Sequence, residues 1–93
     1  MRVYTVAVPT ATLTELTVAD GDYVPGAAIK VNPVAGVDIY VGGSDANAID
    51  KGDLVNTSTG AFYSDLADDE RVFCYQTTGS TQNVKVVMQG TQR

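Results

Sequence analysis

The sequence predicts an all-β fold: a small, jelly-roll-like β-sandwich or barrel of about eight short antiparallel strands. Two observations lead to this prediction. The 93 residues include 14 valines, 3 isoleucines and 11 threonines, and β-branched side chains suit a pleated, half-buried surface better than a long helix. Runs of these residues also end at Gly, Pro, Asn or Asp after about 5–10 positions, which is the spacing of strands and turns. Because this length provides room for one core, residues 1–93 are treated as a single domain.

The N-terminal part of the chain predicts two strands. The first is Arg2–Val8, and Pro9 ends it because proline cannot donate a hydrogen bond to a sheet. The second covers Ala11–Ala19, with Leu16 and Val18 on one face and Leu13, Glu15 and Thr17 on the other. Residues 1–19 are therefore expected to form an N-terminal strand or arm.

The middle of the chain predicts two more strands between strong turn signals. Asp20–Asp22 and Pro25–Gly26 both contain a glycine that can adopt positive φ in a turn. Ala27–Asn32 follows as a strand. Val37–Val41 has the most regular alternation in the chain, and Gly42–Asp45 ends that strand.

The C-terminal part predicts a hairpin and two closing strands. Leu54–Val55 and Ala61–Tyr63 flank a turn at Asn56–Gly60, an arrangement typical of a hairpin. Arg71–Thr77 has apolar residues on both faces, which predicts a central strand. Val84–Gln89 alternates again and is expected to be the last strand.

Composition excludes several classes of partner. Six basic and eleven acidic residues give a net charge of −5, which repels phosphate backbones, so nucleic acid is not an expected partner. No apolar stretch approaches the ~20 residues of a membrane span, so no membrane partner is expected either. Met1–Val6 has the pattern of a strand and not of a leader, and we expect synthesis in a cytoplasm.

The chain contains no histidine, no tryptophan and one cysteine, Cys74. An internal disulfide is therefore impossible, and imidazole and paired-thiolate metal ligands are absent. We expect no cofactor. Because Cys74 alternates with apolar neighbours and has no histidine to activate it, we interpret it as a small buried hydrophobe. A domain this small has a limited core, so we expect it to gain stability as a homo-oligomer.

Two acidic segments were considered as sites of chemistry. Asp45, Asn47, Asp50 and Asp53 are oxygen ligands at the close spacing that calcium prefers, but they lack the offsets of an EF-hand loop. Their side chains also favour turns by bonding their own backbone, so a turn is the preferred interpretation and no metal is predicted. The second segment is interpreted as an exposed acidic loop and not as a general acid/base pair; it contains Asp65, Asp68, Asp69 and Glu70. No catalytic residue is predicted.

Tyrosines are the predicted partner-binding residues, because a tyrosine combines apolar area with a hydroxyl group. The candidates are Tyr4, Tyr23, Tyr40 and Tyr63. Tyr40 stands on the polar side of a regular strand and is the first to test. The alternative is that these rings have only a structural role, packing within the sheets.

Between Ala28 and Gly90 the chain resembles small virion proteins of tailed phages. Such proteins often carry a Val-x-Asn-Pro strand, a Val-Tyr-Val-Gly-Gly-Ser turn, an aromatic segment after a loop, and two closing strands. The corresponding segments here are Lys30-Val31-Asn32-Pro33, Ile39-Tyr40-Val41-Gly42-Gly43-Ser44, Gly60-Ala61-Phe62-Tyr63, Arg71-Val72-Phe73-Cys74-Tyr75 and Val84-Lys85-Val86-Val87.

The resemblance implies a non-enzymatic structural protein on the exterior of a bacteriophage capsid. It is expected to be a decoration (cement) protein that forms a homo-oligomer, such as a trimer, and binds the major capsid protein or another virion protein. No functional residues carry over, because the matching positions are structural. Two alternatives remain: a neck, tail or fibre component of the virion, or a carbohydrate- or receptor-binding β-module.

Overall fold

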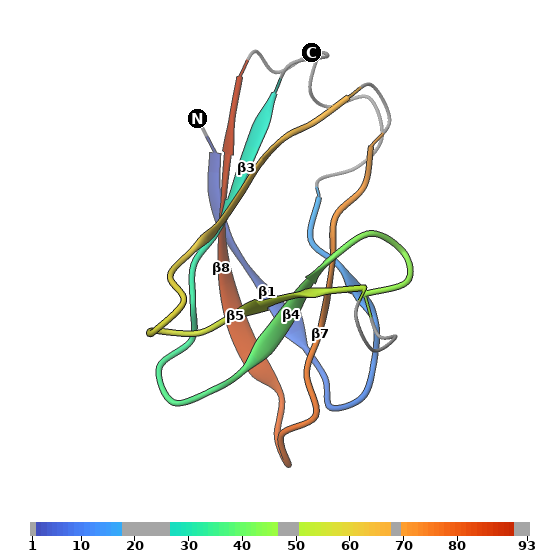
Figure 1. Ribbon diagram of the computed structural model, residues 1–93, viewed down its shortest axis with the longest axis vertical. Helices are drawn as coiled ribbons and strands as arrows, with labels where there is room; N and C mark the ends of the chain where they lie inside the picture. The colour runs from blue at the N-terminus through green and yellow to red at the C-terminus, as the bar shows by residue number, and fades with distance from the viewer. Residues whose placement is uncertain (1, 18–26, 47–50, 68–69, 91–93) are drawn as a thin grey trace.

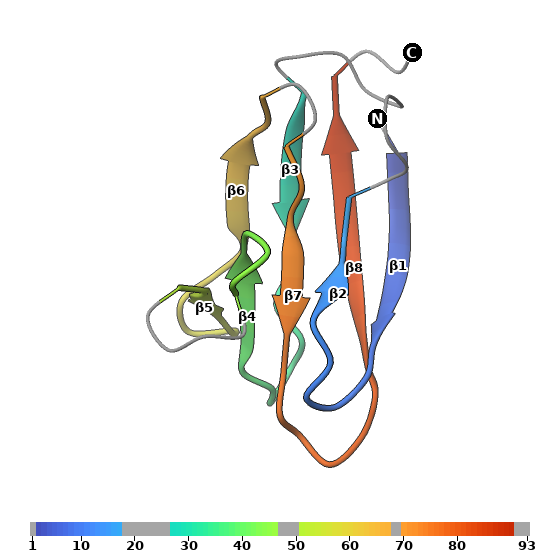
Figure 2. The ribbon, with the colours of Figure 1, turned by 90° about the vertical axis from the view of Figure 1, so that its right-hand side faces the viewer.

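Two antiparallel sheets, packed face to face, make up the fold, as expected for a β-sandwich (Figures 1 and 2). The computed structural model describes residues 2–17, 27–46, 51–67 and 70–90. Sheet A has the strand order β1-β8-β3-β6, and sheet B the order β2-β7-β4-β5. The strands are β1 (Arg2–Val8), β2 (Thr14–Glu15), β3 (Ala28–Val31), β4 (Ile39–Gly42), β5 (Asp53–Val55), β6 (Phe62–Asp65), β7 (Phe73–Tyr75) and β8 (Gln82–Gln89).

The strand pairing is nested. β1 pairs with β8, β2 with β7, β3 with β6 and β4 with β5, all antiparallel. Two further pairs, β3 with β8 and β4 with β7, join these units into sheets. A long hairpin folded over on itself in this way is a jelly roll, so the jelly-roll-like prediction is confirmed.

The core lies between the sheets and is built from alternate residues of each strand. Residues directly opposite one another in an antiparallel pair share a face, so the register assigns inward and outward positions. The inward alternation predicted for Val37–Val41 and Val84–Gln89 is confirmed, since Ile39 and Val84 are fully buried and Tyr40 is exposed. The buried cluster comprises Val8, Leu16, Ile29, Val31, Ile39, Val41, Val55, Leu66, Val72, Cys74, Val84, Val86 and Met88.

The predicted strand Ala11–Ala19 is wrong in its extent, because only Thr14–Glu15 forms a strand among its described residues. Ala11 has φ +53°, a left-handed conformation that a strand cannot contain. Its amide instead donates to the carbonyl oxygen of Gln76 at 2.7 Å. The hydroxyl group of Thr12 bonds the backbone oxygen of Thr10, so this segment is a turn between the two sheets. The turns predicted at Asp20–Asp22 and Pro25–Gly26 lie outside the described residues.

The predicted hairpin around Asn56–Gly60 is also wrong. The turn exists: the Asn56 side-chain oxygen accepts from two backbone amides, and the Gly60 amide donates to the Asn56 carbonyl at 2.9 Å. However, β5 pairs with β4 in sheet B and β6 pairs with β3 in sheet A. Six residues separate Val55 from Phe62, which is enough to cross the roughly 10 Å between two packed sheets. The turn therefore connects the layers.

A buried polar side chain ties the two layers together at one end. Gln76, at 0% exposure, follows β7 of sheet B. Its amide nitrogen donates to the carbonyl oxygens of Val8 in sheet A and of Ser80, each at 2.9 Å. Its side-chain oxygen accepts from the Thr78 amide at 2.6 Å. These contacts give hydrogen-bond partners to both the nitrogen and the oxygen of the buried side-chain amide, as a polar group in a core requires.

Gln76→Leu should lower the free energy of unfolding by at least about 2 kcal/mol, because it leaves the Val8 and Ser80 carbonyls without these partners. Urea denaturation measures the change. The matched control is Gln89→Leu, an exposed position on β8, which should change stability by less than about 0.5 kcal/mol. Equal effects of the two substitutions would show that the Gln76 contacts do not hold the layers together.

Candidate functional site

The four tyrosines predicted to bind partners have different environments. Tyr4 is half-buried, and its hydroxyl group donates to the Leu16 carbonyl at 2.5 Å, which links β1 to the segment after β2. Tyr40 is 36% exposed and Tyr63 is 69% exposed. Tyr23 lies outside the described residues. The structure therefore does not bring the tyrosines together, and Tyr63 offers the most accessible ring of the three described.

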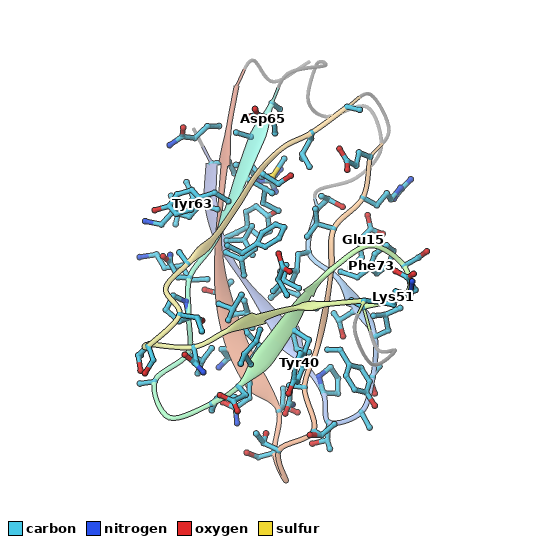
Figure 3. The ribbon with its side chains drawn as sticks, in the orientation of Figure 1. Glu15, Tyr40, Lys51, Tyr63, Asp65 and Phe73 are labelled. Carbon is cyan, nitrogen blue, oxygen red and sulfur yellow. The ribbon has the colours of Figure 1, made fainter. Side chains whose placement is uncertain are left out.

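The register places Tyr40 and Tyr63 on opposite outer faces of the sandwich. Tyr40 is on sheet B, opposite Tyr75 on one side and Leu54 on the other. Tyr63 is on sheet A, opposite Lys30. In Figure 3, Tyr63 projects from the side of sheet A, away from Glu15, Phe73 and Lys51 on the side of sheet B. These two faces are the surfaces on which a partner could dock.

The outer face of sheet B, face B, is partly covered by its own chain. Its described outward positions are Glu15, Tyr40, Gly42, Leu54, Phe73 and Tyr75. The segment after β4 folds back over this face. Ala46 is buried, and a side chain at Gly52 would come within 2.9 Å of the Tyr40 Cβ. The backbone oxygen of Lys51 would lie 3.0 Å from a Cβ added at Gly42. Both glycines are needed for this close approach.

The outer face of sheet A, face A, carries a row of four residues across all four strands. Val3, Val87, Lys30 and Tyr63 are successive partners in the register. Val3 is 50% exposed. The Lys30 ammonium lies 5.6 Å from the centroid of the Tyr63 ring, within the range of a cation–π contact. The row combines apolar area with one positive charge.

Face A is poor in acidic residues. Its outward positions are Val3, Thr5, Ala7, Ala28, Lys30, Tyr63, Asp65, Asn83, Lys85, Val87 and Gln89. These positions include two lysines and one aspartate, whereas the whole chain has a net charge of −5. These outward positions therefore do not share the excess of acidic residues of the whole chain.

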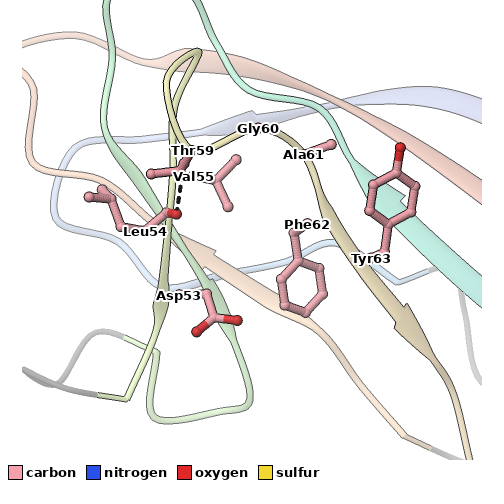
Figure 4. A pocket seen from close by; sticks show the side chains of 8 residues that line it. All are labelled: Asp53, Leu54, Val55, Thr59, Gly60, Ala61, Phe62 and Tyr63. Carbon is pink, nitrogen blue, oxygen red and sulfur yellow. Dashed lines mark hydrogen bonds between the residues drawn. The ribbon is translucent and has the colours of Figure 1, made fainter.

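A pocket of about 420 Å³ opens where β5 and β6 meet at the edge of the sandwich (Figure 4). Leu54 and Tyr63 lie on opposite sides of it in this view. The Thr59 hydroxyl group, which also lines it, donates to the Leu54 carbonyl at 3.1 Å. Asp53 contributes a carboxylate and Phe62 a second ring. Aromatic rings beside a carboxylate can hold a small polar ligand by stacking and hydrogen bonding.

The structure brings together no metal site from the described residues. Asp45 and Asp53 are exposed, and Asn47 and Asp50 lie outside the described part of the chain. No group of three or more acidic or cysteine side chains there is placed to hold a metal ion. In the second acidic segment, Asp65 and Glu70 are exposed, and Asp68 and Asp69 are not described.

Cys74 is fully buried on the inward face of β7, as predicted for a small hydrophobe. Burial, which disfavours the thiolate, raises the pKa of the Cys74 thiol from 9.0 to about 12, although a backbone hydrogen bond from Tyr75 opposes part of this shift. The position of β7 between β2 and β4 confirms the predicted central strand, although the strand extends only over Phe73–Tyr75 and not over Arg71–Thr77.

Val3 and Val87 on face A were not singled out from the sequence. The available signal was a break in alternation: Val84, Val86 and Met88 face the core, and Val87 places an apolar side chain on the opposite face among polar neighbours. An apolar residue at an outward position of a strand is informative because it is not required by the core.

Comparison with known proteins does not extend these observations. No protein-family model, no curated protein and no solved structure matches the chain. No helix within the described ranges is long and apolar enough to cross a membrane.

Tyr4→Phe should lower the free energy of unfolding by about 1 kcal/mol, because it removes the hydrogen bond to the Leu16 carbonyl. Tyr63→Phe is the matched control and should leave stability unchanged, since that side chain is mostly exposed. Chemical denaturation of both variants measures the difference. No loss in Tyr4→Phe would contradict a structural role for the Tyr4 hydroxyl group.

The raised pKa of Cys74 predicts a loss of stability at alkaline pH. Above pH 9.0 the unfolded thiol releases its proton, whereas the folded thiol keeps it until about pH 12, so unfolding becomes progressively more favourable between these values. Comparing the pH dependence of unfolding with that of Cys74→Ala isolates this contribution from the titration of lysines and tyrosines. Identical slopes for the two proteins would refute the prediction.

Proposed function

We propose that the chain is a non-enzymatic structural protein of a tailed-phage virion, namely a capsid decoration protein. It is assembled in the host cytoplasm, self-associates, and binds the exterior of the shell through contacts with the major capsid protein. The observation that carries the proposal is face A, an uncovered, acid-poor sheet surface on an acidic protein.

Face A has the composition of a contact surface. The exposed Val3 and Tyr63 lie in one row with the half-buried Val87 and Lys30, and aromatic residues are enriched in protein interfaces. The Lys30 stem and the Tyr63 ring present apolar area with one charge, which can pair with an acidic partner. Face B is a weaker candidate, because the segment around Ala46 and Gly52 already covers part of it.

The architecture is compatible with this role. Jelly-roll sandwiches occur in viral capsid domains and in lectins, so the fold alone does not select between a shell protein and a sugar-binding module. The resemblance of the Ala28–Gly90 segments to small phage virion proteins favours the shell. A sheet face can also make the same contact many times on a repeating lattice.

A carbohydrate- or receptor-binding module is the second candidate, and the pocket between β5 and β6 favours it. The pocket is lined by the Phe62 and Tyr63 rings and by the Asp53 carboxylate. Under this alternative, a glycan binds at the open edge of the sandwich and face A is only a solvated surface.

The decisive experiment adds purified protein to bare capsids that lack it and measures the number of copies bound per shell and the resistance of the shell to heat. A decoration protein should bind in a fixed ratio to the shell subunits and raise the temperature of shell disruption. A few copies confined to one vertex would indicate a neck or tail component instead.

Tyr63→Ala should weaken capsid binding at least about fivefold, because tyrosine is enriched among the interface residues whose truncation costs more than about 1 kcal/mol. Tyr40→Ala removes the same side chain from face B and should leave binding unchanged. A glycan-binding screen of the same variants separates the second candidate: glycan binding lost in Tyr63→Ala, with no binding to capsids by any variant, would overturn the decoration role.

A further inference from the structure

The four edge strands of the sandwich differ in length and charge. β2, β5 and β6 have two, three and four residues, and each contains an acidic residue: Glu15, Asp53 and Asp65, respectively. β1 has seven residues and contains none. Among the described strands, β1 is therefore the longest edge and the one without negative charge.

β1 also lacks the features that keep an edge strand from pairing with another chain. Its register with β8 runs without interruption from Arg2 to Val8, and no described strand pairs with its other side. Natural edge strands are commonly protected by a central charge, a proline or a bulge. From Val3 to Val8 the strand has no charged residue and no proline, and the uninterrupted register leaves no place for a bulge.

We propose that β1 is a self-association edge, at which a second copy of this chain adds its own β1 in antiparallel orientation. The inference deepens the proposed function, because it rests on self-association being part of that function. Antiparallel addition joins two copies of sheet A into one continuous eight-stranded sheet and satisfies the backbone groups along both edges. The occupant is a second copy because the same strand is complementary to itself.

Symmetry fixes the register. A two-fold pair that keeps both copies of face A on the same side has its axis perpendicular to the sheet. In such a pair, one residue of β1 lies directly opposite the same residue of the second copy. Thr5 is the middle residue of β1, so an axis beside Thr5 pairs all seven residues, with Val3 opposite Ala7 of the other copy. Any other axis shortens the ladder.

Charge placement supports this register. Arg2 is the single charged residue of β1 and stands at its end, so the two copies of Arg2 come to opposite ends of the ladder, about 20 Å apart. Of the acidic edges, β5 and β6 lie on the opposite side of the sandwich from β1, whereas β2 lies on the same side, in the other sheet (Figure 2). The pair also doubles face A, because the two outer surfaces become continuous. It is a dimer and not the trimer named from the sequence.

A cysteine placed at the axis tests the register directly. Thr5→Cys should form a disulfide-linked dimer under mild oxidation, because opposite residues of an antiparallel pair have Cα atoms about 4.5–5.5 Å apart, within reach of a disulfide. The native Cys74 is buried and does not compete. Asn83→Cys is the control: it lies on face A, but on the interior strand β8, and should stay monomeric on reducing-agent-free gels. A monomeric Thr5→Cys protein would overturn the proposal.

Sedimentation without capsids provides a second, independent readout. The wild-type protein should sediment as a dimer at micromolar concentration. Thr5→Lys, which places two like charges at the axis, should raise the dissociation constant at least tenfold. Asn83→Lys adds the same charge to the same face away from the axis and should dimerise like the wild type. Circular dichroism establishes that both variants fold.

The two proposals fail in different ways. A wild-type monomer or trimer, or a Thr5→Lys variant that dimerises normally, overturns the β1 edge even if capsid binding is intact. A dimer that is sensitive to Thr5→Lys supports the edge even if no capsid binds, and in that case only the decoration role is refuted.

Discussion

The fold depends on the insertion of β8 between β1 and β3. This last strand of the sandwich pairs with the first strand on one side and with β3 on the other, and its Val84, Val86 and Met88 side chains are buried in the core. Sheet A therefore cannot close until β8 is in place. Because such pairings join residues far apart in sequence, loop-closure entropy must be overcome before most of the core forms.

The alternation that builds the core also determines the outer faces. Each inward residue of β8 places its neighbour on face A, so the exposed Lys85 and the half-buried Val87 lie on this face as a direct consequence of the burial of Val84 and Val86. A strand has no other way to arrange its side chains. The proposed contact surface is thus the reverse side of the core, and a substitution on face A tests binding without opening a cavity.

Size and charge together explain why assembly is the proposed role. A core built from short strands gives a small domain a limited reserve of stability, and association with neighbours increases that reserve. A net charge of −5 opposes association between copies, and this repulsion is smaller where acidic residues are few. β1 forms one edge of face A, so self-association uses the backbone of β1 while docking uses the outward side chains of the same sheet, including that of Val3.

The sequence by itself determined the fold class, most strand positions and the inward residues, such as Ile39 and Val84, because alternation with a period of two is a local property. It also identified Cys74 as a buried residue. Only the tertiary structure decided which strands are neighbours: the Asn56–Gly60 turn connects two sheets instead of closing a hairpin. It also decided that Tyr4 bonds the backbone while Tyr63 is exposed, and that β1 is an edge. The physical reason is that strand partners are chosen by packing between segments distant in the chain, which no local pattern records.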